Sequence, residues 1–507
     1  MTKKIVVVGG GTAGWLTALS VKKAYSDFDV TVIESKEIGI LGAGEGSVPQ
    51  LVEFFESLDV PVSDLIKNCD ATLKNGIKFT NWNNDNKFYY HGFATTDNQL
   101  DISASRSKRT ATYPLLVSSL SLNNAVNEID FTEKISENNK SPFILKDVNN
   151  KNKISDYQQL SSFSIHFNAT KLANRLKEIG ISRGIKVIEN TIKQVSLDSN
   201  HYVKSLTLDN SDIVNRDFVF DCSGFHRLII GKVFDSPWKS YHDVLPVDAA
   251  VPFFIDMEDQ IPPYTEAIAM KYGWMWKIPL QSRFGCGYVY DSSLISEAEA
   301  IKEIEEFLGY EPFYPRQGRG GFKFNAGCYE ESWINNCIAI GLSSSFIEPL
   351  EATSLWVSIF ALNKIFAGPE WITNNVSPIR NEFNKIIAAT NNEIVNFIYF
   401  HYMGLRKDTK FWQKFSYDNA PEKLKEKLTL WQHRLPNKND SEGMWPFSSW
   451  FVIGSGIENI NKSIAKDYIN NIKKYNKELE GYDYYLNYQK YKSHECMDHK
   501  QFLENLQ

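Results

Sequence analysis

Short apolar runs separated by mixed segments shape the first 35 residues of the chain. Residues 5–8 are an uninterrupted hydrophobic run and residues 30–33 are apolar except for Thr31, which is typical of strands that are buried on both faces of a parallel sheet. The residues between the two runs are predicted to form a helix. The pattern therefore predicts a strand, helix, strand unit at the start of the chain.

Later segments continue the same alternation. Residues 167–177 place apolar side chains at helical spacing, and Gly184 then leads into a predicted strand at 185–188. Residues 218–220 form another buried run, which ends in a turn of small residues between Asp221 and Gly224. Because the carboxyl ends of such strands face ligands, we expect Asp221 and Gly224 at the ligand edge of the sheet.

The first strand runs directly into a glycine motif. The motif predicts a tight turn at Gly9, close approach to a pyrophosphate at Gly11 and close helix packing at Gly14, and Glu34 follows at the spacing of a ribose-binding carboxylate. A secretory signal is the alternative reading of this apolar start, but three consecutive glycines and the lack of a small-residue cleavage site argue against it. The predicted nucleotide contacts are Gly9, Gly10, Gly11, Thr12, Ala13, Gly14 and Glu34.

These elements predict an α/β fold with a Rossmann-type dinucleotide-binding domain. The region 1–360 is expected to hold a discontinuous nucleotide-binding module, and residues 361–507 a mainly helical region on the substrate side. The module is assigned to about 1–70, 160–225 and 325–360, and an inserted β-rich substrate layer to about 75–160 and 225–325. The glycine-rich segment 39–49 is expected to cross the cofactor as a strap, with a surface turn as the alternative. The tail from Ser463 onward is expected to be solvated helix.

Composition narrows the function classes. The chain has 507 residues, 43% hydrophobic and 13% aromatic, enough to bury a large core in two or three structural units. No apolar run approaches the roughly 18 residues that span a bilayer, and the net charge of -6 comes from mixed signs without a basic cluster. The six cysteines show no Cys-x-x-Cys spacing. We therefore expect a soluble cytoplasmic protein with a small-molecule partner, and no nucleic acid, membrane segment or bound metal.

Three further segments carry a resemblance to a known family. They are the hexad Trp274-Met-Trp-Lys-Ile-Pro279, the lysine segment at residues 71–79, and the segment 336–354, which contains Glu-Pro-Leu-Glu-Ala-Thr. Together with the glycine motif they resemble the flavin-dependent halogenases of the tryptophan halogenase family, over most of the chain to about residue 455. The resemblance implies a fold of the flavin monooxygenase kind with bound FAD.

The resemblance also implies the roles of individual residues. Lys74 and Glu351 correspond to the catalytic lysine and carboxylate, the backbone at Thr353 and Ser354 to the halide site, and Trp274 and Trp276 to a wall that separates flavin from substrate. His401 is expected beside the aromatic substrate, with core packing as the alternative, and Trp450 is expected to supply a stacking face for a flat aromatic substrate. Further FAD contacts are expected at Ser35, Gly46, Ile192, Leu342 and Leu355.

Some positions depart from the family pattern. Leu73 replaces a phenylalanine, Ala352 replaces a common serine, and Cys328 stands where arginine is frequent. Ser354 stands where the tryptophan-dedicated members have glycine, so a dihedral that only glycine adopts would be strained there. These departures leave the halide preference open.

The family chemistry implied is that reduced FAD from a separate reductase reacts with dioxygen and halide to give hypohalous acid. The acid then halogenates an electron-rich aromatic such as an indole or a phenol. An aromatic hydroxylase of the same fold is one alternative, although it usually shows a Gly-Asp pair where this chain has Gly341-Leu342. A flavin-binding scaffold without turnover is another. The physiological acceptor and homo-oligomerisation are left open.

Overall fold

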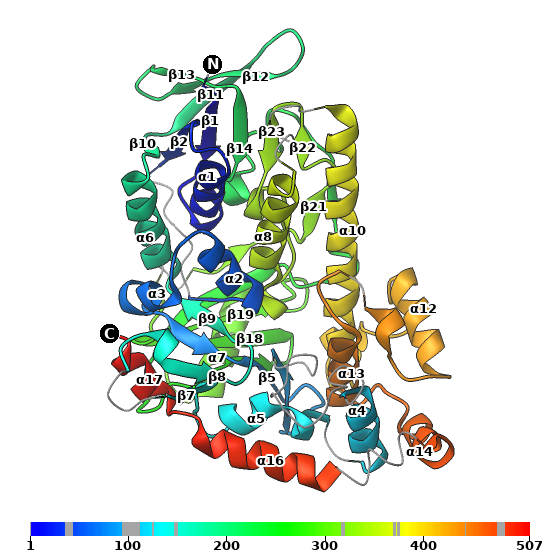
Figure 1. The fold of residues 1–507 in the computed structure, drawn as a ribbon. Helices are drawn as coiled ribbons and strands as arrows, with labels where there is room; N and C mark the ends of the chain where they lie inside the picture. The colour runs from blue at the N-terminus through cyan, green and yellow to red at the C-terminus, as the bar shows by residue number, and fades with distance from the viewer. Residues whose placement is uncertain are drawn as a thin grey trace.

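The computed structural model describes residues 2–35, 44–93, 112–123, 126–146, 151–315, 320–368, 372, 376–441, 443–473 and 482–507. Figure 1 shows an elongated molecule with one sheet near the amino terminus and a second sheet at the other end. The long helix α10 (Ser377–His401) runs along one side from the first end toward the second.

The predicted strand, helix, strand unit is present and forms the centre of a six-stranded sheet. Ile5 pairs with Phe218 on one side and with Val30 on the other, both in parallel register. The edge strand β22 is antiparallel, whereas the other pairings are parallel. The order is β10 (Lys186–Glu189), β2 (Asp29–Glu34), β1 (Lys4–Val8), β14 (Phe218–Asp221), β23 (Cys337–Ala339) and β22 (Trp333–Ile334).

Two helices cover one face of this sheet, and a glycine in one of them lets the two helices pack closely against each other. Helix α1 (Thr12–Ala24) lies against α6 (Ala169–Ser182), where a side chain at Gly180 would meet the Trp15 ring at 2.7 Å. Asn168 caps α6 by accepting hydrogen bonds from two backbone N–H groups of its first turn. The helix predicted at 167–177 is therefore confirmed, and it extends further than predicted.

A seven-stranded sheet forms the second layer, and its two faces carry different side chains. On one face Trp274 and Trp276 pack toward α10, and on the other Met275 packs toward α7 (Glu297–Leu308). Successive residues of a strand point to opposite faces, so one strand contributes to both cores. The order is β20 (Phe322–Lys323), β16 (Ala249–Asp256), β19 (Arg283–Tyr290), β18 (Gly273–Pro279), β17 (Thr265–Ala269), β5 (Gly76–Thr80) and β6 (Phe88–Gly92).

Smaller sheets complete the β structure. The most important for the site is β3 (Glu45–Gly46), β9 (Ser164–Phe167) and β4 (Thr72–Lys74), in which His166 pairs with Gly46 on one side and Thr72 on the other. The others are β15 (Trp238–Ser240) with β21 (Gly327–Tyr329) and β24 (Ser345–Phe346), β11 (Ile192–Leu197) with β12 (Val203–Leu208) and β13 (Ile213–Asn215), and β7 (Phe143–Leu145) with β8 (Tyr157–Gln159).

The region beyond residue 360 is helical, as predicted. Short helices also connect the sheets. The remaining helices are α2 (Pro49–Ser57), α3 (Val62–Asn68), α4 (Thr112–Ser121), α5 (Phe131–Ser136), α8 (Thr353–Phe366), α11 (Lys410–Gln413), α12 (Glu422–Trp431), α13 (Phe447–Gly456), α14 (Lys462–Asn471), α16 (Tyr482–Glu495) and α17 (His499–Asn505).

The expectation of a solvated tail is wrong for the last helix. Phe502 and Leu503 of α17 are buried in the main core, and the Phe502 ring stacks on Phe143 at 4.7 Å. Figure 1 shows the carboxyl terminus returning to β9 and α3. Charge alternation along the tail did not reveal these few apolar positions, which are enough to dock the helix.

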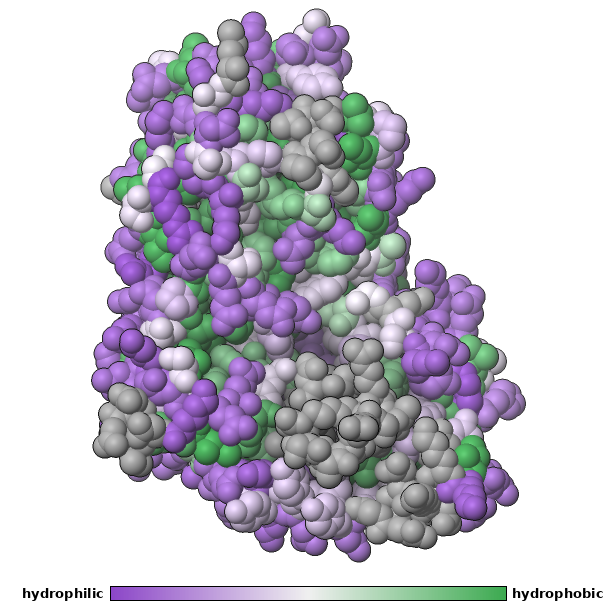
Figure 2. All heavy atoms as spheres, in the orientation of Figure 1, coloured by the Kyte–Doolittle hydropathy of each residue, from purple (hydrophilic) through white to green (hydrophobic). Residues whose placement is uncertain are grey.

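The exterior shows no segregation of residue types on the face in Figure 2, where hydrophilic and hydrophobic residues are interspersed. Within the described ranges, no helix has both the length and the apolar character needed to cross a membrane. In the same ranges, no group of three or more His, Cys, Asp or Glu residues is arranged to hold a metal ion.

His499 ties the last helix to strand β4. Its Nε2 accepts a hydrogen bond from the Leu73 N–H (3.0 Å), its Nδ1–H donates to the Ile261 carbonyl (2.8 Å), and the ring is fully buried. One partner can only donate and the other can only accept, so the ring is the neutral Nδ1–H tautomer. Burial lowers the pKa of His499 to about 4.

We expect His499→Asn to destabilise the protein at pH 7 by about 1–3 kcal/mol, because the buried Leu73 N–H loses its acceptor. We expect the difference from wild type to shrink at pH 5. As the pH falls from the ordinary histidine value toward 4, the unfolded wild type binds a proton that the folded state excludes, so the wild type loses stability that the variant does not. Thermal unfolding at both pH values measures this, and an equal difference at both would contradict it.

Candidate functional site

The glycine motif forms an open cradle between β1 and α1. A side chain at Gly9, whose φ is +118°, would meet the Cys222 carbonyl at 2.2 Å, and one at Gly14 would meet the Gly9 carbonyl at 1.9 Å. By contrast, a side chain at Gly11 would meet nothing within 4 Å. The outer glycines thus allow the strand and helix to pack, while Gly11 leaves space at a helix start, where anions bind favourably. These residues fit a dinucleotide pyrophosphate.

Three other predicted FAD contacts, Glu34, Ser35 and Ile192, lie near the same cradle. Glu34 ends β2 and accepts a hydrogen bond from Lys177 at 2.5 Å, and its carboxylate lies where a side chain at Gly10 would be. Ser35 is hydrogen-bonded to Thr191 at 2.9 Å, next to Ile192 at the start of β11. Ser35 and Ile192 therefore lie beside Glu34, the predicted ribose-binding carboxylate.

The family segment that follows β23 reaches the cradle from the other side. Leu342 lies in a short 3-10 turn, Gly341–Ser343, and a side chain at Gly341 would meet Ala13 of α1 at 2.8 Å. Leu355, in the first turn of α8, packs against the main core. The strap predicted at 39–49 lies partly outside the described residues. Its described end reaches Gly46, where a side chain would meet Lys74 Nζ at 3.3 Å, so Gly46 adjoins the predicted catalytic lysine.

Lys74 is a buried amine at the end of β4. Its side chain is 1% exposed, and its Nζ lies 5.3 Å from the centre of the Phe93 ring. Burial lowers the pKa of Lys74 to about 8, against the opposing effect of the Glu351 charge. The amine and ammonium forms are therefore both accessible near neutral pH.

Glu351 occupies a strained turn just before α8. It is 4% exposed, and both Glu351 (φ 67°) and Ala352 (φ 55°) adopt the left-handed conformation, which costs roughly 1–2 kcal/mol per residue. Ser354 lies in the first turn of α8 and is not among the residues with positive φ. The strain expected at Ser354 is therefore absent there and falls on Glu351 and Ala352 instead.

Two histidines hold the same oxygen of Glu351. His91 Nδ1 lies 2.7 Å and His401 Nε2 lies 3.0 Å from Glu351 Oε1. No hydrogen bond to Glu351 Oε2 from another described residue is present, so that oxygen is left to act on a ligand. Shared donors of this kind fix a carboxylate in one orientation.

The partners of the two rings limit how each can be protonated. His91 Nε2 is hydrogen-bonded to the Ser449 hydroxyl (2.9 Å), which can donate or accept, so His91 can donate from Nδ1 to the carboxylate in both its neutral and its protonated form. His401 Nδ1 donates to the Phe397 carbonyl (2.8 Å), and its Nε2 also faces an acceptor. Both nitrogens of His401 must therefore carry hydrogen, which makes the ring an imidazolium beside the carboxylate.

The net charge of Glu351 follows from these contacts. Burial by itself would raise the pKa of Glu351, but the positive field and hydrogen bonds of His91 and His401 outweigh it and hold the pKa well below its ordinary value. Glu351 is thus ionised across the neutral range.

The predicted halide position provides unpaired donors. Thr353 Oγ1 and Ser354 Oγ are buried and have no hydrogen-bond partner among the described residues. The backbone N–H groups of the first helical turn also lack intrahelical partners. Buried donors at a helix start suit a small anion, so the residues present fit a halide.

The two hexad tryptophans lie on the site-facing side of β18. Trp274 and Trp276 meet edge to face with ring centres 6.3 Å apart, and Trp276 covers Gly287, where a side chain would clash at 2.1 Å. Trp274 Nε1 donates to Glu348 Oε2 at 2.8 Å. The wall is thus fixed by packing and by one hydrogen bond.

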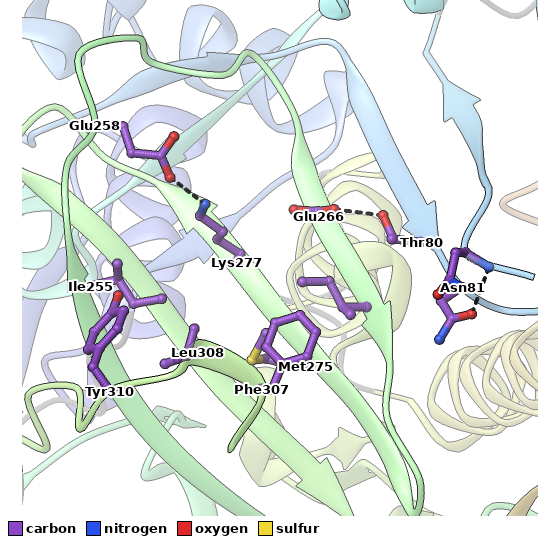
Figure 3. Close-up of a pocket in the computed structure, with 12 residues that line it drawn as sticks. Thr80, Asn81, Ile255, Glu258, Glu266, Met275, Lys277, Phe307, Leu308 and Tyr310 are labelled. Atoms are coloured by element: carbon purple, nitrogen blue, oxygen red, sulfur yellow. Dashed lines mark hydrogen bonds and ion pairs between the residues drawn. The ribbon is translucent and has the colours of Figure 1, made fainter. Parts of the chain in front are cut away.

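The reverse side of β18 borders an outer groove that none of the predicted site residues line. Met275 and Lys277 line this groove of about 370 Å³, and Lys277 pairs with Glu258 at 2.9 Å (Figure 3). Phe307, near the end of α7, and Tyr310, just after that helix, also line the groove. The groove and the candidate site are therefore separated by the thickness of the sheet.

Trp450 and His401 both lie in the aromatic core around α10. Trp450 is fully buried and packs on Phe397 at 4.8 Å and on Trp431 at 5.6 Å. The structure thus places Trp450 in the aromatic core, and it gives His401 a direct hydrogen bond to Glu351.

Sequence reasoning missed three groups of the site. His91 lies on β6 at the end of a short aromatic run, and Phe93 follows just after the strand, with Gly92 between the two residues. Glu348 lies three positions before Glu351, within the family segment 336–354. The available signal was a charged residue in an otherwise apolar strand-to-turn segment, which requires a buried partner.

The fold and site together define a class of protein: an α/β protein with a Rossmann-type dinucleotide cradle and a separate site that holds a buried lysine and a buried carboxylate. The sequence profile of the family "Tryptophan halogenase" matches residues 4–468. The chain belongs to the tryptophan halogenase family. It is a flavin-dependent halogenase that acts on an aromatic substrate.

Individual relatives show the extent of the similarity. Tryptophan 6-halogenase SttH from Streptomyces toxytricini is 33% identical over 472 residues, covering 88% of this chain and 86% of the relative. Tryptophan 7-halogenase RebH from Lentzea aerocolonigenes is 31% identical over 492 residues, covering 90% and 89%. The crystal structure of SttH superposes with a TM-score of 0.87 at 27% identity, covering 99% of this chain and 100% of that chain. BrvH, a flavin-dependent halogenase from Brevundimonas sp. BAL3, gives 0.83 at 26% identity, covering 100% and 99%.

The cradle predicts opposite behaviour for two glycine variants. Gly11→Ala should leave the unfolding temperature of the flavin-free protein almost unchanged and weaken FAD binding at least tenfold, because the new methyl group enters only the ligand space. Gly14→Ala should lower the unfolding temperature of the flavin-free protein, because the methyl group overlaps the Gly9 carbonyl. Calorimetry and FAD titration measure both effects. Unchanged FAD affinity in Gly11→Ala would place the pyrophosphate elsewhere.

Proposed function

We propose that the protein halogenates an electron-rich indole- or phenol-type ring, using halide, dioxygen and reduced FAD delivered by a separate flavin reductase. Lys74 and Glu351 are the catalytic residues of this proposal. One observation carries it: a buried lysine and a buried, ionised carboxylate come from distant segments to one place, beside the unpaired donors of Thr353 and Ser354.

When bound, reduced FAD supplies hypohalous acid from dioxygen and halide. The cradle around Gly11 and the carboxylate of Glu34 would hold the nucleotide, and Thr353 and Ser354 would hold the halide. Trp274 and Trp276 keep the aromatic substrate away from the flavin, so that the oxidant and not the flavin reaches the ring.

Lys74 acts on the oxidant. As an ammonium it donates a hydrogen bond to the oxygen of hypohalous acid, which makes the halogen more electrophilic. When the ring carbon bonds to the halogen, the oxygen–halogen bond breaks and the departing hydroxide takes a proton from Lys74 to become water. A pKa near 8 suits this transfer, because the proton is held at neutral pH and is readily given up.

Glu351 acts on the substrate. The attacked ring becomes a cation, which the ionised carboxylate stabilises by charge. Oε2, the oxygen not held by histidine, is free to accept the proton that the ring carbon loses. A weakly basic carboxylate is sufficient because the cationic ring is a strong acid. The products balance as the halogenated ring and water.

The acceptor is proposed from chemistry and from the relatives. SttH and RebH are named tryptophan halogenases, so tryptophan is the first acceptor to test in this chain. The hydroxylase alternative is not favoured by the family match or by the solved neighbours.

The acceptor and halide are tested together. Aerobic reactions with reduced FAD and tryptophan, indole or phenol, each with chloride, bromide and iodide, are followed by mass spectrometry. We expect halogenated ring products, with bromide or iodide incorporated in preference to chloride, because larger halides are easier to dehydrate and to oxidise. Hydroxylated products would support the alternative activity, and mainly chlorinated product at equal halide concentrations would contradict the preference.

Lys74→Ala should reduce ring halogenation at least about 100-fold while consumption of reduced FAD continues, because the lysine acts after the oxidant is formed. Lys78→Ala is the matched control. Lys78 lies on the neighbouring strand β5 and pairs with Glu137 at 2.7 Å, away from Glu351. Product formation by Lys74→Ala at the wild-type rate and ring position would remove Lys74 from the mechanism.

A further inference from the structure

Glu348 is a buried carboxylate that the mechanism above does not use. It is 0% exposed, and it lies in the turn that joins β24 to the residues before α8. Burying an ionisable group without a purpose is costly, so its contacts need an explanation.

One oxygen of Glu348 joins two separate elements of the molecule. Oε2 accepts hydrogen bonds from Trp274 Nε1 on β18 at 2.8 Å and from the Tyr402 hydroxyl after α10 at 2.5 Å. The other oxygen, Oε1, is buried and has no partner among the described residues. Burial raises the pKa of Glu348 to about 7, against the two hydrogen bonds.

The contact fixes the Trp274 ring. A buried indole N–H needs an acceptor, and Glu348 is the acceptor that the structure provides. Tyr402 in turn is held by a stacked contact with Phe415 at 4.3 Å, so Oε2 itself has a fixed position. The wall tryptophan is thereby attached to the helical core and does not depend on packing alone.

The contacts of Glu348 are also connected to the acceptor site. Glu348 bonds Tyr402, and Glu351 in the same turn bonds His401, the preceding residue of the chain. Two consecutive residues at the end of α10 therefore position both groups: Trp274, through Glu348, on the flavin side, and Glu351 on the substrate side.

We propose that Glu348 is a positioning residue that locks Trp274 in the wall and so confines the oxidant to the path that ends at Lys74. This role rests on the proposed function, because confinement matters only when a diffusible oxidant is made. Without the Glu348 acceptor, Trp274 is free to turn, and the oxidant escapes before it reaches the acceptor site.

The test measures where the oxidant goes. Wild type and variants turn over with bromide and an aromatic acceptor in the presence of monochlorodimedone, a halogen trap in bulk solution. The readout is the ratio of brominated trap to brominated acceptor. We expect Glu348→Leu and Trp274→Phe to raise this ratio at least fivefold, and Glu348→Gln, which retains one acceptor oxygen, to raise it less. Glu348→Leu and Trp274→Phe each remove the same contact between Glu348 and Trp274. The double variant that combines them should therefore give the same ratio as either single variant.

Trp412→Phe is the matched control. It also removes a buried indole N–H, but this one donates to the Met270 carbonyl at 2.8 Å. We expect its ratio to stay at the wild-type value. In protein labelled with 5-fluorotryptophan, the Trp274 fluorine resonance should move in Glu348→Gln and remain in place in Trp412→Phe.

The outcomes separate the two proposals. If wild type brominates neither acceptor nor trap, the proposed function fails. If wild type brominates the acceptor and both Glu348→Gln and Trp274→Phe partition the oxidant as wild type does, the role of Glu348 is overturned while the function stands. Should Glu348→Leu fold poorly, the other two variants still decide.

Discussion

The bond between Glu351 and its two histidines is the constraint on which the site depends. Glu351 carries two energetic costs: its backbone adopts the left-handed conformation, and its charged carboxylate is buried. His91 from β6 and His401 from α10 compensate both by supplying charge and hydrogen bonds to one oxygen. The carboxylate is thereby held ionised in one orientation, and its charge is felt by Lys74. Loss of one donor would leave the buried charge with a single partner.

The rest of the architecture brings these partners together. The seven-stranded sheet supplies His91 and the tryptophan wall, α10 supplies His401 and Tyr402, and α17 holds the strand of Lys74 through His499. The sheet and α10 therefore meet at the turn of Glu351, while α17 supports the strand that carries Lys74. Contacts from two distant elements hold that turn, which suits a site that must guide a reactive, diffusible oxidant.

The elements that were predicted well are those whose sequence pattern is contained in a short stretch of the chain. The buried strands at 5–8, 30–33 and 218–220, the first helix and the spacing of the glycines follow from local periodicity and local sterics. The tail was predicted as helix for the same reason, but its docking was missed. Docking depends on a cavity built by other segments, which the charge pattern of the tail does not describe.

The sequence by itself determined the nucleotide cradle, the family and the identity of the lysine and glutamate, because each has a motif of contiguous residues. Only the tertiary structure decided what surrounds them. His91, His401, Glu348 and His499 are single polar residues in apolar segments, and their partners lie on distant strands or helices. Protonation and orientation depend on burial and on such partners, which arise only when the sheets and α10 close on one another.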